Sequence, residues 1–497
     1  MSMKEVETRC GKIRGVAAGN PEIMVYKGIP YAEPPVGKLR WRPPVPKKKW
    51  EGVLDASRYG NICPQILPAE GTFYYNEFFK TECNETQSED CLQLNIWTAA
   101  KSPKEKLPVL IFIHGGGFQT NYSFAPQFDG ENMAAHGVVV VSINYRLGVF
   151  GFLAHPDLIE ESEKGLAGNY GLLDQICACQ WVRDNIHFLG GDPEKITISG
   201  GSAGAESVML LSLSDLTRGW FQRAIMQSGP LLESRTSLKE SAEDGKKFLE
   251  RLGYSSIEEA RNVDADILKT YGPDLDKGDR MFLAPCIDGY VLSEEPIQAI
   301  KHGKQHDMDY LTGCNKDEGK SMRNRFYATL EELQESMKKC YGEYNEEYLK
   351  HVSFSTTEEA KEFQLVHGFT ENMYVYCLAW CELQKEDTDK KCYLYHFDRE
   401  LPGDDNGAFH ACEHWYVFET LKHCWRDFKG EDYELSEVVA KYWSNFVKTG
   451  TPNGEGLPVW IPYDKKHQGE MRLNRVCQMS APAITGAIAA RVKYFCD

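Results

Sequence analysis

The chain has 497 residues and a formal net charge of −17, and 42% of its residues are hydrophobic, as is usual for a globular protein. The acidic excess argues against a nucleic-acid-binding function, because contact with a polyanion requires a basic surface. The N-terminal residues are charged and lack an apolar secretory leader. The longest apolar runs have about seven residues, whereas about 20 are needed to span a bilayer. We therefore expect no membrane partner and a cytoplasmic location, in which the sixteen cysteines remain reduced.

Short apolar runs alternate with helical patterns along the chain. Residues 109–113 and 138–143 are almost continuously apolar, which is typical of central strands covered on both faces. Residues 195–199 form a third candidate strand, and residues 169–187 and 203–211 have helical spacing. This alternation predicts an α/β fold with a doubly wound, mostly parallel central sheet and helices on both faces.

The chain contains no internal repeat, low-complexity tract or linker-like segment. We therefore expect residues 1–497 to form a single domain. Residues 235–277 and 329–388 are rich in helix-forming patterns, and we expect them to be helical insertions that cap the sheet.

The most specific motif is Gly-Gly-Ser-Ala-Gly at residues 200–204, between a predicted strand and a predicted helix. A serine at such a turn has a strained backbone, and its crowded neighbours must be small. The turn presents the Ser202 hydroxyl above the N-terminus of a helix, where negative charge is stabilised. A chance glycine–serine turn would not require this strand and helix, so the pattern indicates a nucleophilic serine.

A second motif, His-Gly-Gly-Gly-Phe at residues 114–118, follows the predicted strand at residues 109–113. Successive glycines allow backbone N–H groups to converge on an oxyanion, and each such donor contributes about 100- to 1,000-fold in rate. A phosphate-binding loop would end in Gly-Lys followed by Ser or Thr, which is absent here. Together with the serine motif, the glycines indicate an oxyanion hole.

These motifs and others along nearly the whole chain resemble the type-B carboxylesterase family, which includes cholinesterases, mammalian carboxylesterases and bacterial p-nitrobenzyl esterases. The resemblance implies an α/β-hydrolase fold and hydrolysis of carboxylic esters without a metal or another cofactor. The further matching segments are residues 26–37, 89–97, 144–153, 168–175, 227–229, 285–289 and 450–453.

The resemblance also implies an acid and a base for the nucleophile Ser202. The family's Asn-Lys-Asp-Glu-Gly motif matches residues 315–319 and identifies Glu318 as the acid, with Asp317 as its rival. The family's base is a His followed three residues later by Glu, which identifies His410 over the nearby His414. The order of nucleophile, acid and base is that of α/β-hydrolases.

By the same resemblance, the N–H groups of Gly116, Gly117 and Ala203 bind the oxyanion. Phe118, Gly201, Met281 and Leu283 stand at positions that match the substrate pocket.

The sequence departs from the family pattern at three places. The residue before the nucleophile is commonly Glu in the family but is Gly201 here, which removes a buried charge and leaves a volume that we expect water or substrate to fill. The loop between Cys63 and Cys91 contains no tryptophan of the kind that holds choline in cholinesterases. Its aromatic residues either line the entrance to an apolar gorge or pack as ordinary loop residues. The two cysteines match the family's loop disulfide, but in a cytoplasmic protein we expect free thiols.

The expected function is therefore hydrolysis of neutral aryl or short-chain alkyl esters, with the ester as a small-molecule partner and with either a monomer or a dimer possible. A catalytically inactive adhesion module of the neuroligin type is an alternative, although such proteins lose the nucleophile. Lipase, feruloyl esterase and amidase activities are further alternatives, because the fold does not determine the substrate.

Overall fold

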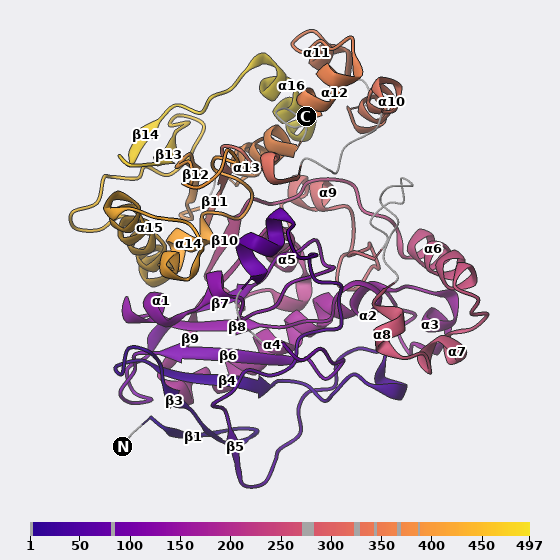
Figure 1. The fold of residues 1–497 in the computed structure, drawn as a ribbon, viewed down its shortest axis with the longest axis vertical. Coiled ribbons are helices and arrows are strands. Elements are labelled where there is room, and N and C mark those ends of the chain that lie inside the picture. The colour runs from indigo at the N-terminus through magenta and orange to yellow at the C-terminus, as the bar shows by residue number, and fades with distance from the viewer. Residues whose placement is uncertain are drawn as a thin grey trace.

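The computed structural model describes residues 3–80, 85–270, 283–322, 329–341, 345–364, 369–385 and 388–497. Its centre is an 11-stranded sheet with the strand order β14-β13-β12-β11-β10-β9-β7-β8-β6-β4-β3 (Figure 1). The strands are β3 (Val16–Ala17), β4 (Met24–Pro30), β6 (Gln93–Thr98), β7 (Leu107–Ile113), β8 (Val139–Ile143), β9 (Gly191–Gly201), β10 (Arg223–Gln227), β11 (Asp309–Asn315), β12 (Cys392–Phe397), β13 (Glu470–Leu473) and β14 (Gln478–Ser480).

The sheet is parallel from β13 through to β8, and antiparallel strands complete both ends. β6, β4 and β3 continue it beyond β8, and β14 pairs with β13. A separate three-stranded sheet near the N-terminus contains β1 (Glu5–Thr8), β2 (Gly11–Arg14) and β5 (Val53–Asp55). The expected mostly parallel sheet is confirmed.

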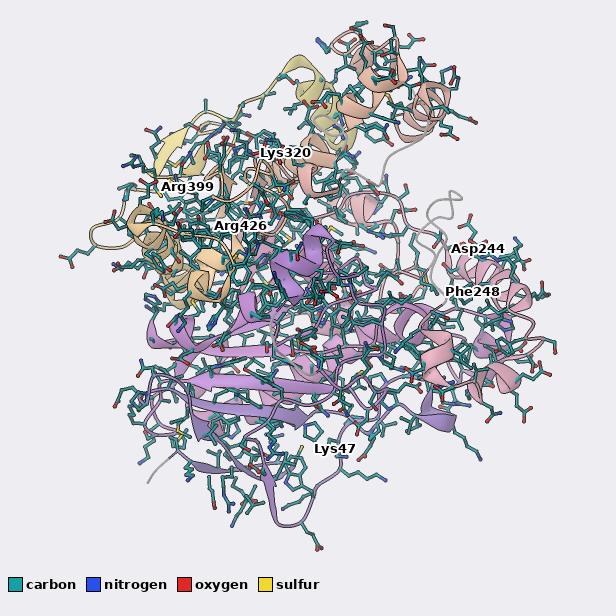
Figure 2. All side chains as sticks on the ribbon, viewed as in Figure 1. Lys47, Asp244, Phe248, Lys320, Arg399 and Arg426 are labelled. Carbon is teal, nitrogen blue, oxygen red and sulfur yellow. The ribbon has the colours of Figure 1, made fainter. Side chains whose placement is uncertain are left out.

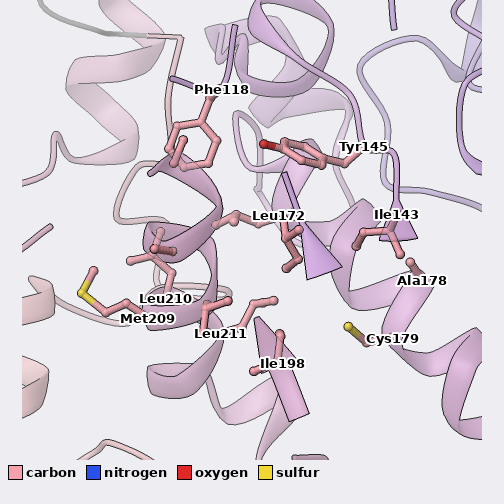
Figure 3. Packing of buried hydrophobic residues seen from close by; sticks show 14 of the residues in the cluster. Phe118, Ile143, Tyr145, Leu172, Ala178, Cys179, Ile198, Met209, Leu210 and Leu211 are labelled. Carbon is pink, nitrogen blue, oxygen red and sulfur yellow. The ribbon is translucent and has the colours of Figure 1, made fainter. Parts of the chain in front are cut away.

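Helices cover both faces of the sheet, which explains why its central strands are apolar along their whole length. In β7, Val109, Ile111 and Ile113 pack in the same cluster as α4 (Tyr170–Asn185) and α5 (Ala203–Leu213), part of which Figure 3 shows. The alternating residues Leu110 and Phe112 pack with helices on the other face. Each fully buried side chain of this size stabilises the fold by about 1.5–3 kcal/mol. The helices of the second face are α1 (Glu131–Ala135), α14 (His414–Val417) and α15 (Gly430–Thr449).

The two stretches expected to be helical insertions contain helices. Residues 235–277 include α6 (Leu238–Arg251), α7 (Ile257–Arg261) and α8 (Ala265–Leu268), and residues 329–388 include α10 (Leu330–Tyr341), α11 (Asn345–Leu349), α12 (Thr357–Phe363) and α13 (Glu371–Glu382). The remaining α-helices are α2 (Gly148–Phe152), α3 (Pro156–Glu161), α9 (Pro296–Lys301) and α16 (Gly486–Cys496).

Helices α10, α11 and α12 have a small hydrophobic core of their own, to which the C-terminal helix α16 contributes Ala487. Figure 1 shows these helices at one end of the molecule, beside the C-terminus. That the whole chain acts as one domain stays a prediction. Within the part of the chain that the structure describes, no helix is both long and apolar enough to cross a bilayer.

Candidate active site

The predicted site residues follow the carboxyl ends of neighbouring parallel strands. β7 leads into the glycine motif at residues 114–118, β9 leads into Ser202, and β11 leads into the loop with Glu318. Because parallel strands share one carboxyl edge, their loops gather at a single place, where α/β proteins usually bind their ligands. His410 lies in the segment between the next strand, β12, and α14.

Ser202 occupies the turn between β9 and α5 in a positive-φ backbone conformation, with φ 56° and ψ −127°. A non-glycine residue in such a region carries about 1–3 kcal/mol of strain and persists only where the surroundings enforce it. Here the Ser202 N–H donates to the Gln227 carbonyl at 2.8 Å, and the Ser202 carbonyl accepts from the Glu206 N–H at 2.9 Å. The strained strand-to-helix turn expected from the sequence is confirmed.

The glycines around Ser202 are required by close backbone approach. A Cβ atom at Gly200 would lie 2.4 Å from the carbonyl carbon of Gly204. A Cβ atom at Gly204 would lie 2.1 Å from the Ile113 carbonyl oxygen at the end of β7. Since real Cβ contacts are not this short, side chains at either position would force the strand and the helix apart.

The glycine motif lies directly against the Ser202 turn. A Cβ atom at Gly115 would be 2.5 Å from the Gly201 carbonyl oxygen and 3.0 Å from Ser202 Cβ. Gly116 and Gly117 have φ values of 109° and 61°, which glycine adopts without strain. Ala203 is the first residue of α5, where a helix leaves its backbone N–H groups without intrahelical acceptors. The three predicted oxyanion donors therefore lie in two adjoining backbone segments.

His114 supports the glycine motif from within the core. Burial lowers the pKa of its imidazole to about 4, so the ring is neutral near pH 7. Its Nδ1 donates to the Gly115 carbonyl at 2.9 Å, and its own carbonyl accepts the Tyr145 hydroxyl at 2.9 Å.

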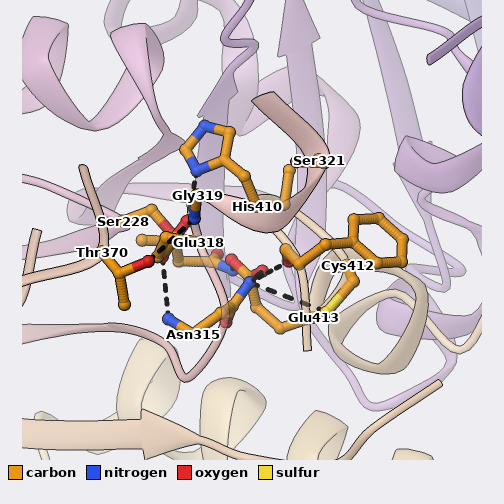
Figure 4. Close-up of polar contacts among 12 residues, drawn as sticks. Ser228, Asn315, Glu318, Gly319, Ser321, Thr370, His410, Cys412 and Glu413 are labelled. Carbon is orange, nitrogen blue, oxygen red and sulfur yellow. Dashed lines mark hydrogen bonds and ion pairs between the residues drawn. The ribbon is translucent and has the colours of Figure 1, made fainter. Parts of the chain in front are cut away.

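Glu318 and His410 are in direct contact: Nδ1 of His410 is hydrogen-bonded to the Glu318 carboxylate (Figure 4). Glu318 is fully buried, and its other oxygen accepts from Ser228 Oγ at 2.5 Å and from the Asn315 N–H at 2.8 Å. These donors fix the carboxylate in one orientation. An acid held in this way orients the ring of a histidine and stabilises its protonated form.

Asp317, the rival acid, faces a different segment. Its carboxylate accepts the Ala408 N–H at 3.0 Å and pairs with Lys320 at 2.8 Å. It therefore fastens the chain just before His410, while Glu318 contacts the imidazole. The geometry favours Glu318 over Asp317, as the sequence motif predicts.

Comparisons with known proteins identify the family of this chain. The model of the carboxylesterase family matches residues 2–486. The para-nitrobenzyl esterase of Bacillus subtilis (strain 168) is 34% identical over 482 residues, covering 94% of each chain. The chain belongs to the carboxylesterase family. It is a carboxylic ester hydrolase with the α/β-hydrolase fold.

Other relatives extend the comparison. The acetylcholinesterase of Electrophorus electricus is 32% identical over 93% of this carboxylesterase and 84% of its own length. The solved structure of a p-nitrobenzyl esterase superposes with a TM-score of 0.82 at 32% identity, covering 96% of this chain and 97% of its own.

One expectation for this carboxylesterase is wrong: the space beside Gly201 is not open to water or substrate. The imidazole of His414 fills it, since a Cβ atom at Gly201 would lie 2.4 Å from both Cε1 and Nε2 of His414. The ring is buried between Phe112 and Phe128, with centroid distances of 5.8 and 5.3 Å. Its Nδ1 donates to the Ala411 carbonyl at 2.9 Å. His414 therefore supports the Ser202 turn, whereas His410 is the histidine that contacts Glu318.

Of the other residues predicted to line the pocket, the structure describes Phe118 and Leu283. Phe118 is buried against Phe152 with ring centroids 5.1 Å apart, and it is left-handed with φ 60°. Leu283 is buried, and its carbonyl accepts from Gln119 Nε2 at 2.7 Å, which brings it beside the glycine motif. Met281 lies outside the described residues.

In the sequence, the Glu three residues after His410, which is Glu413, only identifies the base, and the buried amides that contact this acid have no predicted role. The carboxylate of Glu413 accepts from Gln227 Nε2 at 3.1 Å and from Asn315 Nδ2 at 2.6 Å. Gln227 thus connects the Ser202 turn to Glu413, and Asn315 connects Glu413 to Glu318. All three lie in motifs of the family, but nothing in the sequence shows that they touch. Among the described residues, no His, Cys, Asp and Glu side chains gather into a group of three that could hold a metal.

We predict that Gly201→Ala destabilises the protein by about 1–3 kcal/mol, because the new methyl group collides with the His414 ring. Removing the ring in Gly201→Ala/His414→Ala should recover part of that loss, with a coupling energy of about 0.5–3 kcal/mol in a double-mutant cycle. Thermal or urea unfolding of the parent protein, the two single variants and the double variant measures this coupling energy.

Gly430→Ala is the matched control, since a Cβ atom at Gly430 would meet nothing within 4 Å. Additive effects of the two substitutions at positions 201 and 414 would contradict the contact between them.

Proposed function

We propose that this carboxylesterase acts through Ser202 as nucleophile, His410 as general base and Glu318 as the acid that orients His410. The observation that carries the proposal is the buried contact between His410 and Glu318 at the strand edge that also bears the strained Ser202 turn. The serine needs an adjacent base to become nucleophilic, and the base needs a fixed orientation.

The roles of the groups follow from their chemistry. His410 accepts the Ser202 proton as the oxygen attacks the ester carbonyl, and Glu318 stabilises the imidazolium that forms. The N–H groups of Gly116, Gly117 and Ala203 hold the oxyanion. His410 then protonates the departing alcohol, and water repeats the sequence to release the acid. These steps need no metal or other cofactor.

We propose neutral aryl and short-chain alkyl esters as the substrates. Two buried carboxylates near the site already have partners: Glu413 accepts hydrogen bonds from two amides, and Glu206 is paired with Arg235. Position 201 adds no further negative charge. The fumonisin B1 esterase of Sphingopyxis macrogoltabida is 39% identical over 64% of this chain and 57% of its own length, and its name gives a different ester from that of the para-nitrobenzyl esterase. Rates on p-nitrophenyl esters of increasing acyl length would define the preference and separate esterase from lipase activity.

We also propose a cytoplasmic location and a single-domain enzyme. The free thiols at the described cysteines support a reducing environment. An inactive adhesion module is disfavoured because Ser202, Glu318 and His410 are all present.

Ser202→Ala should lower kcat by at least about 10⁴-fold without changing the melting temperature, because the nucleophile is lost while the turn is kept. A fluorophosphonate should label the parent protein at Ser202, as peptide mapping would show. Ser212→Ala, which alters a buried serine further along α5, is the control. Activity surviving in purified Ser202→Ala would refute the mechanism.

The activity should fall at acid pH. An imidazole titrates near pH 6.5, and only its neutral form accepts the serine proton. We expect kcat/KM to decrease as the pH drops through about 6 to 7. His114 does not cause this fall in kcat/KM, since burial lowers the pKa of its imidazole to about 4. A pH profile that stays flat down to about pH 5 would show either that the pKa of His410 is strongly shifted or that His410 is not the base.

Choline esters should have no advantage over uncharged esters of the same shape. The comparison is the kcat/KM of butyrylcholine against that of 3,3-dimethylbutyl butyrate at low and high salt. We expect the ratio to stay below about tenfold, or 1.4 kcal/mol in transition-state binding. A larger ratio that falls with salt would reveal an anionic group facing the leaving group.

A further inference from the structure

The loop between Cys63 and Cys91 carries a short aromatic segment, residues 73–79, which we call the aromatic segment. Residues Tyr75–Phe79 form one turn of π-helix, a rare conformation that is frequently found at functional sites. At the centre of this turn, Glu77 is the one acidic residue and its side chain is 1% exposed.

Glu77 is surrounded by donors from the segment that follows His410. Its Oε1 accepts from Trp415 Nε1 at 3.1 Å and from Cys424 Sγ at 3.4 Å. Its Oε2 accepts from Trp425 Nε1 at 2.8 Å and from Arg426 Nε at 2.9 Å. A buried carboxylate requires such donors, and here every one of them comes from residues 415–426.

Arg426 links Glu77 to the segment that precedes His410. Its side chain is fully buried, and its remaining nitrogens donate to the Pro402 carbonyl and to the Asp404 carboxylate, both at 2.7 Å. Figure 2 labels Arg426 among the side chains of the molecule. Its guanidinium also lies over the Phe409 ring, 5.0 Å from the centroid. Phe409 immediately precedes His410 in the chain.

The aromatic side chains complete the contact with the segments of the proposed acid and base. The ring of Phe73 meets Phe409 edge-on at 4.9 Å, and Phe78 stacks on Trp415 at 5.8 Å. The Tyr74 hydroxyl lies 3.0 Å from Ser321 Oγ, three residues after Glu318. The aromatic segment therefore joins the Glu318 loop to the His410 segment.

The base of the same loop is fastened differently. Cys63 and Cys91 are free thiols, and Glu89 near the loop's end forms an ion pair with Arg40 at 2.5 Å. Within the aromatic segment itself, Glu77 is the buried carboxylate, and it pairs with Arg426.

We propose that Glu77 is a positioning residue: it holds the aromatic segment against Phe409 and thereby keeps His410 aligned with Glu318. The inference rests on the proposed roles of these two residues. It predicts that loss of Glu77 lowers kcat even in a protein whose stability has been recovered, because a displacement of about 1 Å at a catalytic group reduces the rate about 100-fold.

The test compares three variants with the parent enzyme. Glu77→Ala leaves Arg426 without one of its two carboxylates and should lower both the melting temperature and kcat. Glu77→Ala/Arg426→Met removes both charges and should recover part of the melting temperature, because apolar replacements of a buried ion pair are often tolerated. Its kcat should stay about 100-fold low. Glu77→Gln retains an acceptor for Trp415 and Arg426, so it should keep more activity than Glu77→Ala.

The control is Glu470→Gln in β13, which removes another buried carboxylate with an arginine partner, Arg472, and a tyrosine partner, Tyr374. It should lower the melting temperature while kcat per active site, titrated with a fluorophosphonate, stays at the parent value. A double variant with kcat within about twofold of the parent would overturn the inference.

Parallel measurement of Ser202→Ala distinguishes the positioning role of Glu77 from the proposed function. If Ser202→Ala is inactive and the Glu77 variants keep the parent kcat, only the positioning role of Glu77 is refuted. If Ser202→Ala is active, the proposed function is refuted, and the inference about Glu77 with it.

Discussion

The positive-φ backbone of Ser202 carries about 1–3 kcal/mol of strain, and it persists because the surrounding strands and helix hold it in place. The conformation requires β9 to end where α5 begins, with glycine at positions 200 and 204 so that the helix can approach the end of β7. It also requires an acceptor for the Ser202 N–H, which the Gln227 carbonyl at the end of β10 supplies. The register of three adjacent parallel strands is thus coupled to the orientation of one hydroxyl group.

A continuous polar network extends this constraint to the acid. Gln227 accepts the Ser202 N–H through its backbone and donates to Glu413 through its side chain. Glu413 also accepts from Asn315, whose backbone N–H donates to Glu318. Networks of this kind are stable only when nearly every member is satisfied, so they specify one arrangement of the core. The turn and the acid therefore cannot shift independently of each other.

Features that depend on residues close together in the chain could be predicted from the sequence. The apolar runs located β7 and β8, the helical spacing located α4 and α5, and the glycine–serine motif located the strained turn, because each depends on neighbours in the chain. Glu318 and His410 could be selected only through the resemblance to a family, since 92 positions separate them in the chain.

The contact of Gly201 with His414 was not predicted, because nothing local distinguishes an imidazole that fills a space from one on the surface. The same limit applies to Glu77, whose donors lie more than 300 positions away. The alternatives left open for the aromatic residues, gorge lining or loop packing, could not be separated without knowing that they meet Phe409.

The small core beneath α10, α11 and α12 has a consequence for the order in which the chain folds during synthesis. The C-terminal helix α16 contributes Ala487 to that core, and its Arg491 lies over the Tyr348 ring at 5.5 Å. Its Phe495 meets Tyr376 of α13 at 5.4 Å. Helix α16 follows the other described helices and strands in the chain, and folding during synthesis proceeds from the N-terminal side. The strands that carry Ser202 and Glu318 can therefore pair before α16 completes the small core of α10, α11 and α12.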